Sequence, residues 1–319
     1  MAVKGASPSA GEIFGLRPLG PALRQCLAAI VGDAHAPPSQ WGPSSLKILR
    51  PWLSVPIWLG REPRPRHAVI YNLPNRCPQP AGEGYSVRVT YARDYRGRRL
   101  SYDGHVGTDF AVPAGTRIVA AAPGVVVDVR NDMQRGGLKV CIDHGGGLIT
   151  TSNHLSRALV EPGNLVQRGE PIGLSGMSGV DGVLFFPWLA PHLHFNVLLD
   201  GEPVDPFARG DETSLWRSEG LPTPHRGDPG APMAEPTRWN RVAVDEAVAA
   251  CGDEAMRREL EAVTNDEVRA ARLTVMRLFH SHRFPRREAL TEPAHGRRPW
   301  LDLPLAAEDY DGVVFADEL

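Results

Sequence analysis

Alternating apolar and polar positions dominate the middle of the chain. Seven short segments there are rich in β-branched or aromatic residues, and glycine or proline separates each segment from the next. In chain order they are YSVRVTYA, RIVAAA, GVVVDVR, LKVCIDH, GLITTSN, PIGLSG and LHFNVLL. The turns between them are short, and no long amphipathic helix interrupts them. We therefore predict an antiparallel β domain over residues 85–207.

The two flanks of this domain follow other patterns. Residues 1–84 are broken by prolines and contain three tryptophans, so we expect an irregular extension with one short helix in GPALRQCLAAIVGD. Residues 208–319 start as a proline-rich linker and become helical in TNDEVRAARLTVMRLFHSH, whose apolar residues form one stripe. Thr264 and Glu267 have the spacing of a capping box at the start of that helix. The predicted class is α+β, with a sheet-rich core against which both extensions pack.

Composition narrows the kinds of partner. The formal net charge is −2 with 23% charged residues, which creates no global field for nucleic acid or anionic lipid. Four cysteines without a CxxC pair indicate neither a zinc ribbon nor a disulfide framework. No apolar run reaches the roughly 18 residues of a transmembrane helix, and no signal-peptide pattern is visible. We therefore expect a cytoplasmic location, with action at the cell envelope left open.

Two histidines lie one residue apart in the segment APHLHFNVLLDG. On a strand, His192 and His194 point to the same face with Cα atoms about 6.5 Å apart. Leu193, Phe195 and Val197 then take the opposite face, as a core requires. The pair indicates either a metal site, which needs further ligands, or simply a strand with a polar outer face.

Further candidate ligands precede most of the β segments, in SYDGHVGTDFAVPAG. His105 and Asp109 are four residues apart, and the surrounding glycines and proline disfavour a helix. On a straight strand their Cα atoms would be about 13 Å apart, so they can share an ion only if the chain bends. Gly107 supplies a residue that bends without steric cost. The two are plausible ligands in company with His194 or His192.

Other histidines have weaker context. His154 follows a strand-like segment and is a further candidate. His144 lies in a glycine-rich turn, where we expect it to be solvated. His280 and His282 are two apart on a predicted helix, so their side chains point about 200° apart and cannot chelate one ion. We expect them to form a solvated helix end.

The motifs HxGxD, HLS and HLHF, in this order, resemble those of the zinc metallopeptidases of the lysostaphin and LytM type, family M23. The intervening stretches agree: VPAGTRIVAAAPGVVVDV resembles the glycine-turn hairpin of that family, and VEPGNLVQRGEPIGLSGMSG its later glycine-rich stretch. The resemblance covers about residues 85–207, roughly two-fifths of the chain.

The resemblance implies that His105, Asp109 and His194 bind Zn²⁺ and that His154 and His192 are the catalytic pair. Two histidines and one carboxylate leave the fourth position of zinc for water, as a catalytic site requires. The chain has no HExxH motif and therefore no glutamate base of that kind, so histidines must serve as acid and base.

Two features depart from the family pattern. Ser152 stands where the family often has a tyrosine, so a phenol that helps hold an oxyanion is missing unless Tyr102 or another residue replaces it. The loop between Gly179 and Pro191 is longer than usual and carries three aromatic residues. It either folds onto its own domain or forms an apolar lip on the substrate groove.

The leading functional hypothesis is a zinc endopeptidase that cleaves peptide crosslinks of bacterial peptidoglycan. A second is a non-catalytic LytM-like module that regulates a cell-wall amidase, although such modules generally lose metal ligands and all five positions are present here. A third is an intracellular peptidase with a different target. The expected partner is a peptide substrate, and the sequence does not indicate an oligomeric state.

Overall fold

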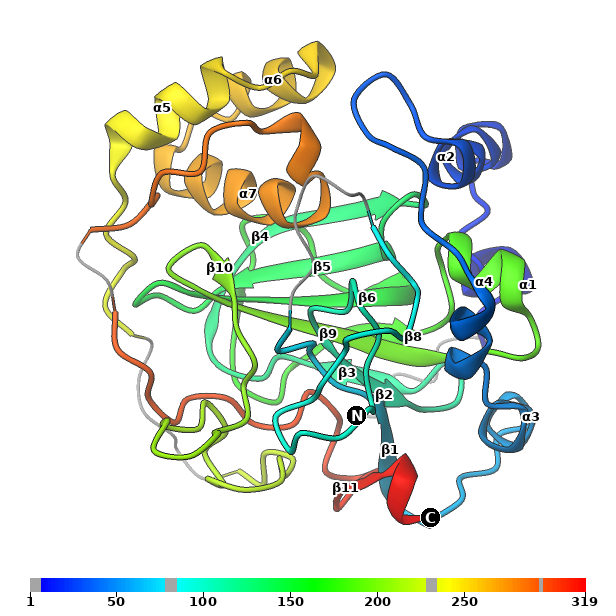
Figure 1. The fold of residues 1–319 in the computed structure, drawn as a ribbon. Helices are drawn as coiled ribbons and strands as arrows, with labels where there is room; N and C mark the ends of the chain where they lie inside the picture. Colours follow the sequence, from blue (N-terminus) through cyan, green and yellow to red (C-terminus); the bar gives the residue numbers. More distant parts are fainter. Residues whose placement is uncertain (1–6, 78–84, 228–233, 293–294) are drawn as a thin grey trace.

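The central feature of the protein is one large, mostly antiparallel sheet (Figure 1). A computed structural model describes residues 7–77, 85–227, 234–292 and 295–319. The strands are β1 (His67–Asn72), β2 (Thr108–Ala111), β3 (Arg117–Val119), β4 (Gly124–Asp132), β5 (Gly137–Asp143), β6 (Leu148–Ala158), β7 (Leu165–Val166), β8 (Pro171–Ser175), β9 (His192–Leu199), β10 (Glu202–Pro203) and β11 (Gly312–Phe315). Their order is β11-β1-β2-β9-β6-β5-β4-β7, with β10 beside β9 and with β8 joining β6 to β3.

Six of the seven predicted segments form strands, and the first does not. YSVRVTYA makes only an isolated bridge, between Ser86 and Gln40. The carboxylate of Asp103 accepts hydrogen bonds from the backbone N–H groups of Thr90 and Tyr91, which a partner strand would otherwise take. The alternating valines of the segment are buried in a small local cluster instead of in a sheet. The prediction of a strand here was therefore wrong.

The sheet also recruits strands from both flanks. β1 pairs in parallel with β11 and antiparallel with β2. Both β1 and β11 are short and lie among arginine- and proline-rich or polar residues, so neither stood out in the sequence. One side of the sheet is thus completed by the two extensions, while the domain limits at residues 84 and 207 stay predictions.

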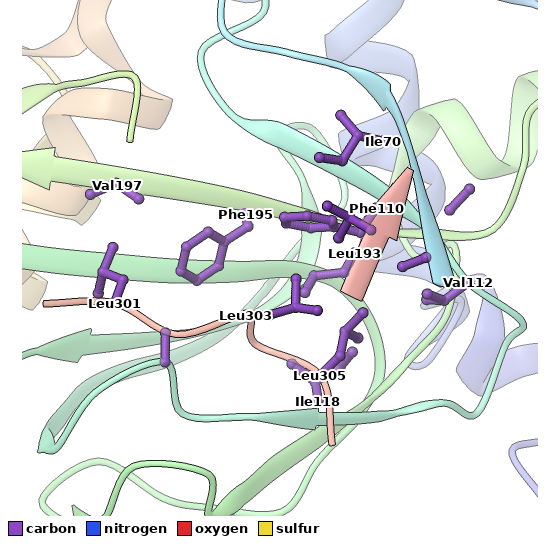
Figure 2. Packing of buried hydrophobic residues seen from close by; sticks show 14 of the residues in the cluster. Ile70, Phe110, Val112, Ile118, Leu193, Phe195, Val197, Leu301, Leu303 and Leu305 are labelled. Atoms are coloured by element: carbon purple, nitrogen blue, oxygen red, sulfur yellow. The ribbon is translucent and has the colours of Figure 1, made fainter. Parts of the chain in front are cut away.

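The main core lies on the face of β9 that the alternation predicted (Figure 2). Leu193, Phe195 and Val197 are at most 1% exposed. Leu301 and Leu303, from the C-terminal extension, belong to the same apolar cluster. The predicted faces of β9 are therefore confirmed, and the C-terminal extension supplies part of what covers the core face.

The helices lie around the sheet. They are α1 (Ala10–Ile13), α2 (Leu19–Val31), α3 (Pro51–Trp58), α4 (Val180–Phe185), α5 (Arg241–Ala249), α6 (Glu254–Glu261) and α7 (Asp266–Phe279), with short 3₁₀ turns η1 (Pro43–Ile48), η3 (Ser281–Arg283) and η4 (Ala316–Glu318). The predicted N-terminal helix is α2, and the predicted C-terminal helix is α7. The capping box was wrong, because Asn265 caps α7 by accepting from the N–H of Val268.

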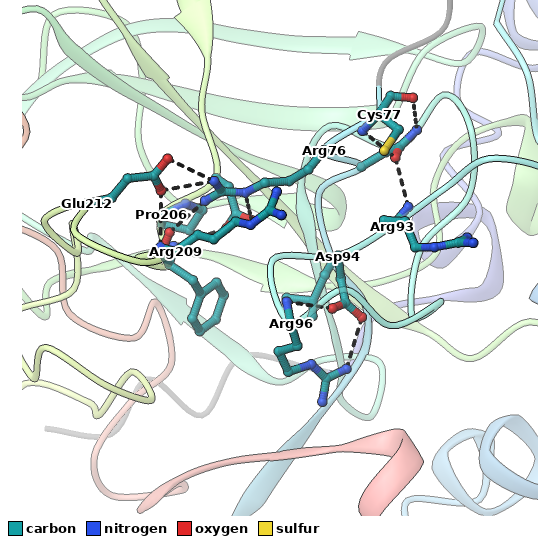
Figure 3. A network of polar contacts seen from close by, with 12 residues as sticks. Arg76, Cys77, Arg93, Asp94, Arg96, Pro206, Arg209 and Glu212 are labelled. Carbon is teal, nitrogen blue, oxygen red and sulfur yellow. Dashed lines mark hydrogen bonds and ion pairs between the residues drawn. The ribbon is translucent and has the colours of Figure 1, made fainter.

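Both extensions pack against the β domain, as predicted. Ala271 and Val275 of α7 share an apolar cluster with residues of β4, β5, β6 and β9. Arg76 of the N-terminal extension binds the carboxylates of Asp205 and Glu212 (Figure 3). None of the helices among the described residues combines the length and apolar character that crossing a membrane requires.

Candidate metal centre and active site

A row of polar side chains crosses four neighbouring strands. Asn72 of β1 pairs with Asp109 of β2, which pairs with His194 of β9, which in turn pairs with Asn153 of β6. Residues directly opposite each other on adjacent strands project to the same face. The strand register alone therefore brings together two of the three predicted metal ligands.

The third ligand, His105, comes from the turn before β2. Its backbone N–H donates to the carbonyl of Tyr102, and the chain then bends at Gly107, between His105 and Asp109, as the sequence required. Its Nδ1–H donates to the carbonyl of Leu73 at 2.8 Å, so Nε2 is the nitrogen that faces the other two candidate ligands. Gly107 does not adopt a positive φ, and what matters is its lack of a side chain. A Cβ there would lie 2.7 Å from Nε2 of His194.

The three side chains fit a zinc ion. One donor atom from each of His105, Asp109 and His194 lies within 4.8 Å of the other two. The Nε2 of His105 is 3.1 Å from Oδ2 of Asp109 and 3.2 Å from Nδ1 of His194. Tetrahedral zinc with bonds of about 2.0–2.2 Å places neighbouring ligand atoms about 3.4 Å apart. Asn72 donates to Oδ2 of Asp109 at 2.8 Å and orients it from behind, as metal-binding carboxylates require.

The protonation states also suit metal binding. Burial lowers the pKa of His194 to about 4, which keeps the imidazole neutral at physiological pH. Burial opposes ionisation of Asp109, but the three neighbouring histidines outweigh it and hold the pKa of this carboxyl well below its usual range. Metal binding requires a neutral imidazole and an ionised carboxylate, so both residues have the protonation state that a metal ligand needs.

His192 lies on the same face of β9 as His194 and next to the candidate ligands. Its Nδ1–H donates to the carbonyl of Ala190 at 2.8 Å, so Nε2 is the unprotonated nitrogen. This Nε2 is 3.8 Å from Oδ1 of Asp109. Burial lowers the pKa of His192 to about 3. The residue is therefore a neutral imidazole beside the candidate metal ligands.

His154 reaches the site through an irregularity in β6. Consecutive strand residues alternate faces, so the residue after Asn153 would normally point into the core. His154 has a φ of 59°, in the left-handed region that costs a non-glycine residue about 1–3 kcal/mol. Its ring nevertheless lies on the polar side, 4.6 Å from the ring of His192. Its Nδ1–H donates to the carbonyl of Ser178 at 2.6 Å, so Nε2 is the ring nitrogen that the backbone does not engage.

All five predicted site residues line one cavity of about 270 Å³. The N-terminal extension contributes Trp41 and Tyr71 to its walls, and the C-terminal extension contributes His280 and Arg283. The extensions thus shape the cavity, as predicted. The roles assigned to the five residues stay predictions, because their convergence shows where they are and not what they bind.

The loop before Pro191 packs its aromatic rings on the N-terminal extension, not on its own domain, whereas its expected role as a lip on a substrate groove stays a prediction. Phe185 packs on Trp41, and Phe186 packs on Trp58, so these aromatic rings hold the loop to the N-terminal extension. Asp181 and Leu184 of the same loop line the cavity. The loop is therefore folded onto the protein and is also part of the cavity wall.

Sequence reasoning did not name Tyr71, the tyrosine whose ring contacts His192. Tyr71 of β1 lines the cavity with its ring 5.3 Å from that of His192, and its hydroxyl has no hydrogen-bond partner among the described residues. The hydroxyl of Tyr102, in contrast, is bonded to that of Tyr85. Ser152 pairs with Phe195 and faces the core, so this position does not leave a gap in the cavity. No local pattern marks Tyr71, because a distant strand pairing places it.

Two further histidines were interpreted wrongly as solvated. His144 is fully buried, with Nδ1–H donated to the carbonyl of Pro123 and Nε2 accepting from the hydroxyl of Thr150. His280 is buried at the end of α7, with Nε2 2.6 Å from a carboxylate oxygen of Asp132 on β4. Both act as structural links, and tertiary packing rather than local sequence buries them.

Known proteins match the region that contains this site. Residues 103–206 match the profile described as Peptidase family M23. The chain is 44% identical over 102 residues to Peptidoglycan DD-endopeptidase ShyA of Vibrio cholerae, covering 32% of this chain and 22% of that protein. It is 35% identical over 120 residues to DD-carboxypeptidase/endopeptidase Mpg of Neisseria meningitidis, covering 38% and 24%.

Solved structures are matched over a similar share. A zinc containing peptidase from Vibrio cholerae has 30% sequence identity and a TM-score of 0.32, over 44% of this chain and 38% of that one. The chain spans only about a fifth of the length of the first curated relatives, so the likeness is that of one domain. The profile match identifies residues 103–206 as a domain of peptidase family M23.

Proposed function

We propose that this protein is a zinc-dependent peptidase that hydrolyses peptide bonds in the crosslinks of bacterial peptidoglycan. One observation carries the proposal: His105, Asp109 and His194 converge in a cavity that is also lined by two more histidines, each held by its Nδ1–H on a backbone carbonyl. The first three residues would hold the metal. Bound zinc supplies a Lewis acid that polarises the scissile carbonyl and lowers the pKa of water.

His154 and His192 would move the protons. Each donates Nδ1–H to a backbone carbonyl, so each presents Nε2 as an acceptor. A neutral imidazole can take a proton from the attacking water and return it to the departing amine. The buried carbonyl contacts fix both rings before the substrate arrives, so no reorientation is needed during the reaction.

Tyr71 would donate a hydrogen bond to the oxyanion that forms during the reaction. Its hydroxyl is a neutral donor that the described residues leave unused, and its ring lies against His192. Donors aimed at the charge that develops in the transition state are worth about 10²–10³ in rate. This role needs no residue at position 152, which faces the core.

The substrate class comes from the relatives. ShyA is named as a peptidoglycan DD-endopeptidase and Mpg as a DD-carboxypeptidase/endopeptidase. A peptidoglycan substrate places the proposed reaction at the cell envelope. A regulatory, non-catalytic module is the second candidate, but nothing in it would require two histidines held with free Nε2 atoms beside a complete ligand set.

Zinc analysis combined with a digest of purified crosslinked muropeptides tests the proposal. The purified protein should carry about one zinc per chain and cleave the crosslinks. His194→Ala should lose the metal, whereas His192→Ala should keep it and lose roughly 10²–10⁴-fold in activity. His35→Ala, at an exposed position, is the matched control. Zinc binding without any hydrolysis would favour the regulatory module, and zinc retained by His194→Ala but lost by His192→Ala would reverse the two roles.

A further inference from the structure

The cavity contains two opposite charges that do not pair with each other. Arg135 lies on the turn between β4 and β5, and Asp181 lies in the first turn of α4. Within the described part of the chain, neither side chain forms an ion pair, and the carboxylate of Asp181 accepts no hydrogen bond. The guanidinium of Arg135 makes one long contact, 3.4 Å, to the backbone carbonyl of Gln134.

Another arginine of the same cavity shows how this chain holds a structural guanidinium. Arg283 binds the carboxylates of Asp33 and Asp253 and so ties the two extensions together. An unpaired charge in a cavity loses its hydration when a ligand fills the space, which is costly unless the ligand supplies the opposite charge. Arg135 and Asp181 therefore favour a ligand that carries an anion and a cation.

Both charges stand beside His154. The carbonyl of Gly136, next to Arg135, accepts from the backbone N–H of His154 at 2.9 Å. The carbonyl of Ser178, three residues before Asp181, accepts from its ring at 2.6 Å. The two segments that hold the proposed catalytic histidine are thus the same two that carry the charges.

The surroundings of Arg135 and Asp181 leave each side chain able to bind a group of opposite charge. The guanidinium of Arg135 lies over the ring of Tyr85, 4.8 Å from its centre, which orients the planar group while leaving its N–H donors available. Burial raises the pKa of Asp181, and the nearby His154 ring and Arg135 guanidinium only partly oppose this. An ammonium group on a ligand would stabilise the ionised carboxylate.

We propose that Arg135 and Asp181 form a subsite for a free α-amino acid group, with the carboxylate of the ligand on Arg135 and its ammonium on Asp181. The inference rests on the proposed function, since it places this group on the peptide that is cleaved. A diaminodicarboxylic acid in a peptidoglycan stem ends in such a group when its side chain is not crosslinked. Lysine at the same position carries the ammonium but no carboxylate.

Three synthetic crosslinked peptides test the subsite. They share the scissile D-alanyl bond and differ in the residue before it: meso-diaminopimelate, lysine, or diaminopimelate with its side-chain amine acetylated. Wild-type protein should cleave the first with a kcat/KM about 10–100-fold higher than the other two, because each lacks one charge-assisted hydrogen bond. Arg135→Gln should abolish the preference over lysine, and Asp181→Asn the preference over the acetylated peptide.

Controls separate this subsite from general damage. Arg24→Gln and Asp211→Asn make the same chemical changes at exposed positions outside the cavity and should keep the wild-type preferences. Thermal unfolding checks that each variant folds. Equal cleavage of all three peptides by the wild type, or an unchanged preference in Arg135→Gln, would overturn the subsite.

Failure of the proposed function gives a different result. If zinc-loaded wild type cleaves none of the peptides, the peptidase proposal fails. Calorimetric titration of the metal-free protein with the same three peptides then tests the subsite without catalysis. The same order of affinities, lost in the two variants, would support it, and equal binding of all three would refute it.

Discussion

Gly107→Ala should weaken metal binding without removing a ligand. The added Cβ would lie 2.7 Å from Nε2 of His194, 2.8 Å from its Cε1 and 2.9 Å from Nδ2 of Asn196. Ordinary contacts begin near 3.4 Å, so the imidazole must move away by about 0.7 Å or the backbone must yield. The Nε2 and Cε1 atoms belong to the imidazole of His194, whose Nδ1 faces Asp109 and His105.

This displacement is large on the scale of metal coordination. Zinc–ligand distances tolerate deviations of about 0.2 Å, so a shift of about 0.7 Å leaves His194 poorly placed. Disturbing the groups that orient a ligand typically costs 10–100-fold in affinity. We expect a loss in this range or above, with some loss of stability from overpacking, about 1–3 kcal/mol.

Competition with a chromophoric chelator measures the zinc affinity, and thermal unfolding of the metal-free protein measures the stability separately. Gly220→Ala is the control, because its Cβ would meet only one atom, at 3.9 Å, and its φ is not positive. Wild-type zinc affinity in a folded Gly107→Ala variant would show that His194 is not held as the structure indicates, and the reasoning would be wrong.

Three further predictions concern groups around the cavity. Tyr71→Phe removes a buried hydroxyl without a described partner, so it should keep or raise Tm while lowering kcat about 10²-fold. Tyr95→Phe, outside the cavity, should change neither Tm nor kcat. Full activity of Tyr71→Phe would contradict the oxyanion role. Burial lowers the pKa of His144 from 6.5 to about 4, so its contribution to stability is complete above pH 6.5 and declines as the pH falls toward 4, where only the unfolded chain gains the proton. Denaturant unfolding across this range should show a loss of roughly 1–3 kcal/mol that His144→Asn removes, and an identical pH dependence in both proteins would refute the assignment. Arg283→Met leaves the carboxylate of Asp33 without its ion pair, so it should lower the free energy of unfolding by about 3 kcal/mol. It should also speed limited proteolysis of the N-terminal extension. Unchanged proteolysis would show that this ion pair does not hold the extension.

Much of the β domain could be predicted because its signals are local. Period-two alternation assigns the faces of a strand from its own residues, so Leu193 and Phe195 were placed in the core correctly. The same rule placed His192 and His194 on one face, and the bend before Asp109 followed from the distance that shared binding of an ion demands. The resemblance of the motifs to family M23 indicated which histidine of this pair would bind the metal, a choice that alternation alone left open.

Other parts of the fold depend on contacts between distant segments. β1 pairs with β11, more than two hundred residues away, on one side and with β2 on the other, and the pairing with β2 puts Asn72 opposite Asp109. Nothing within either short segment specifies its partner, because pairing is chosen by which sheet edge is free once the rest has folded. His154 likewise reaches the cavity only through a left-handed residue in β6 that alternation does not predict.

The sequence by itself determined the strand faces and the set of candidate ligands, since both depend on spacing within a few residues. The tertiary structure decided which polar groups lost water and what they met: His144 was buried, and Arg135 and Asp181 were left facing one cavity without partners. Burial and charge pairing are properties of surfaces brought together from separate segments. For this reason the candidate metal ligands could be identified along the chain, whereas the other residues that line the cavity could not.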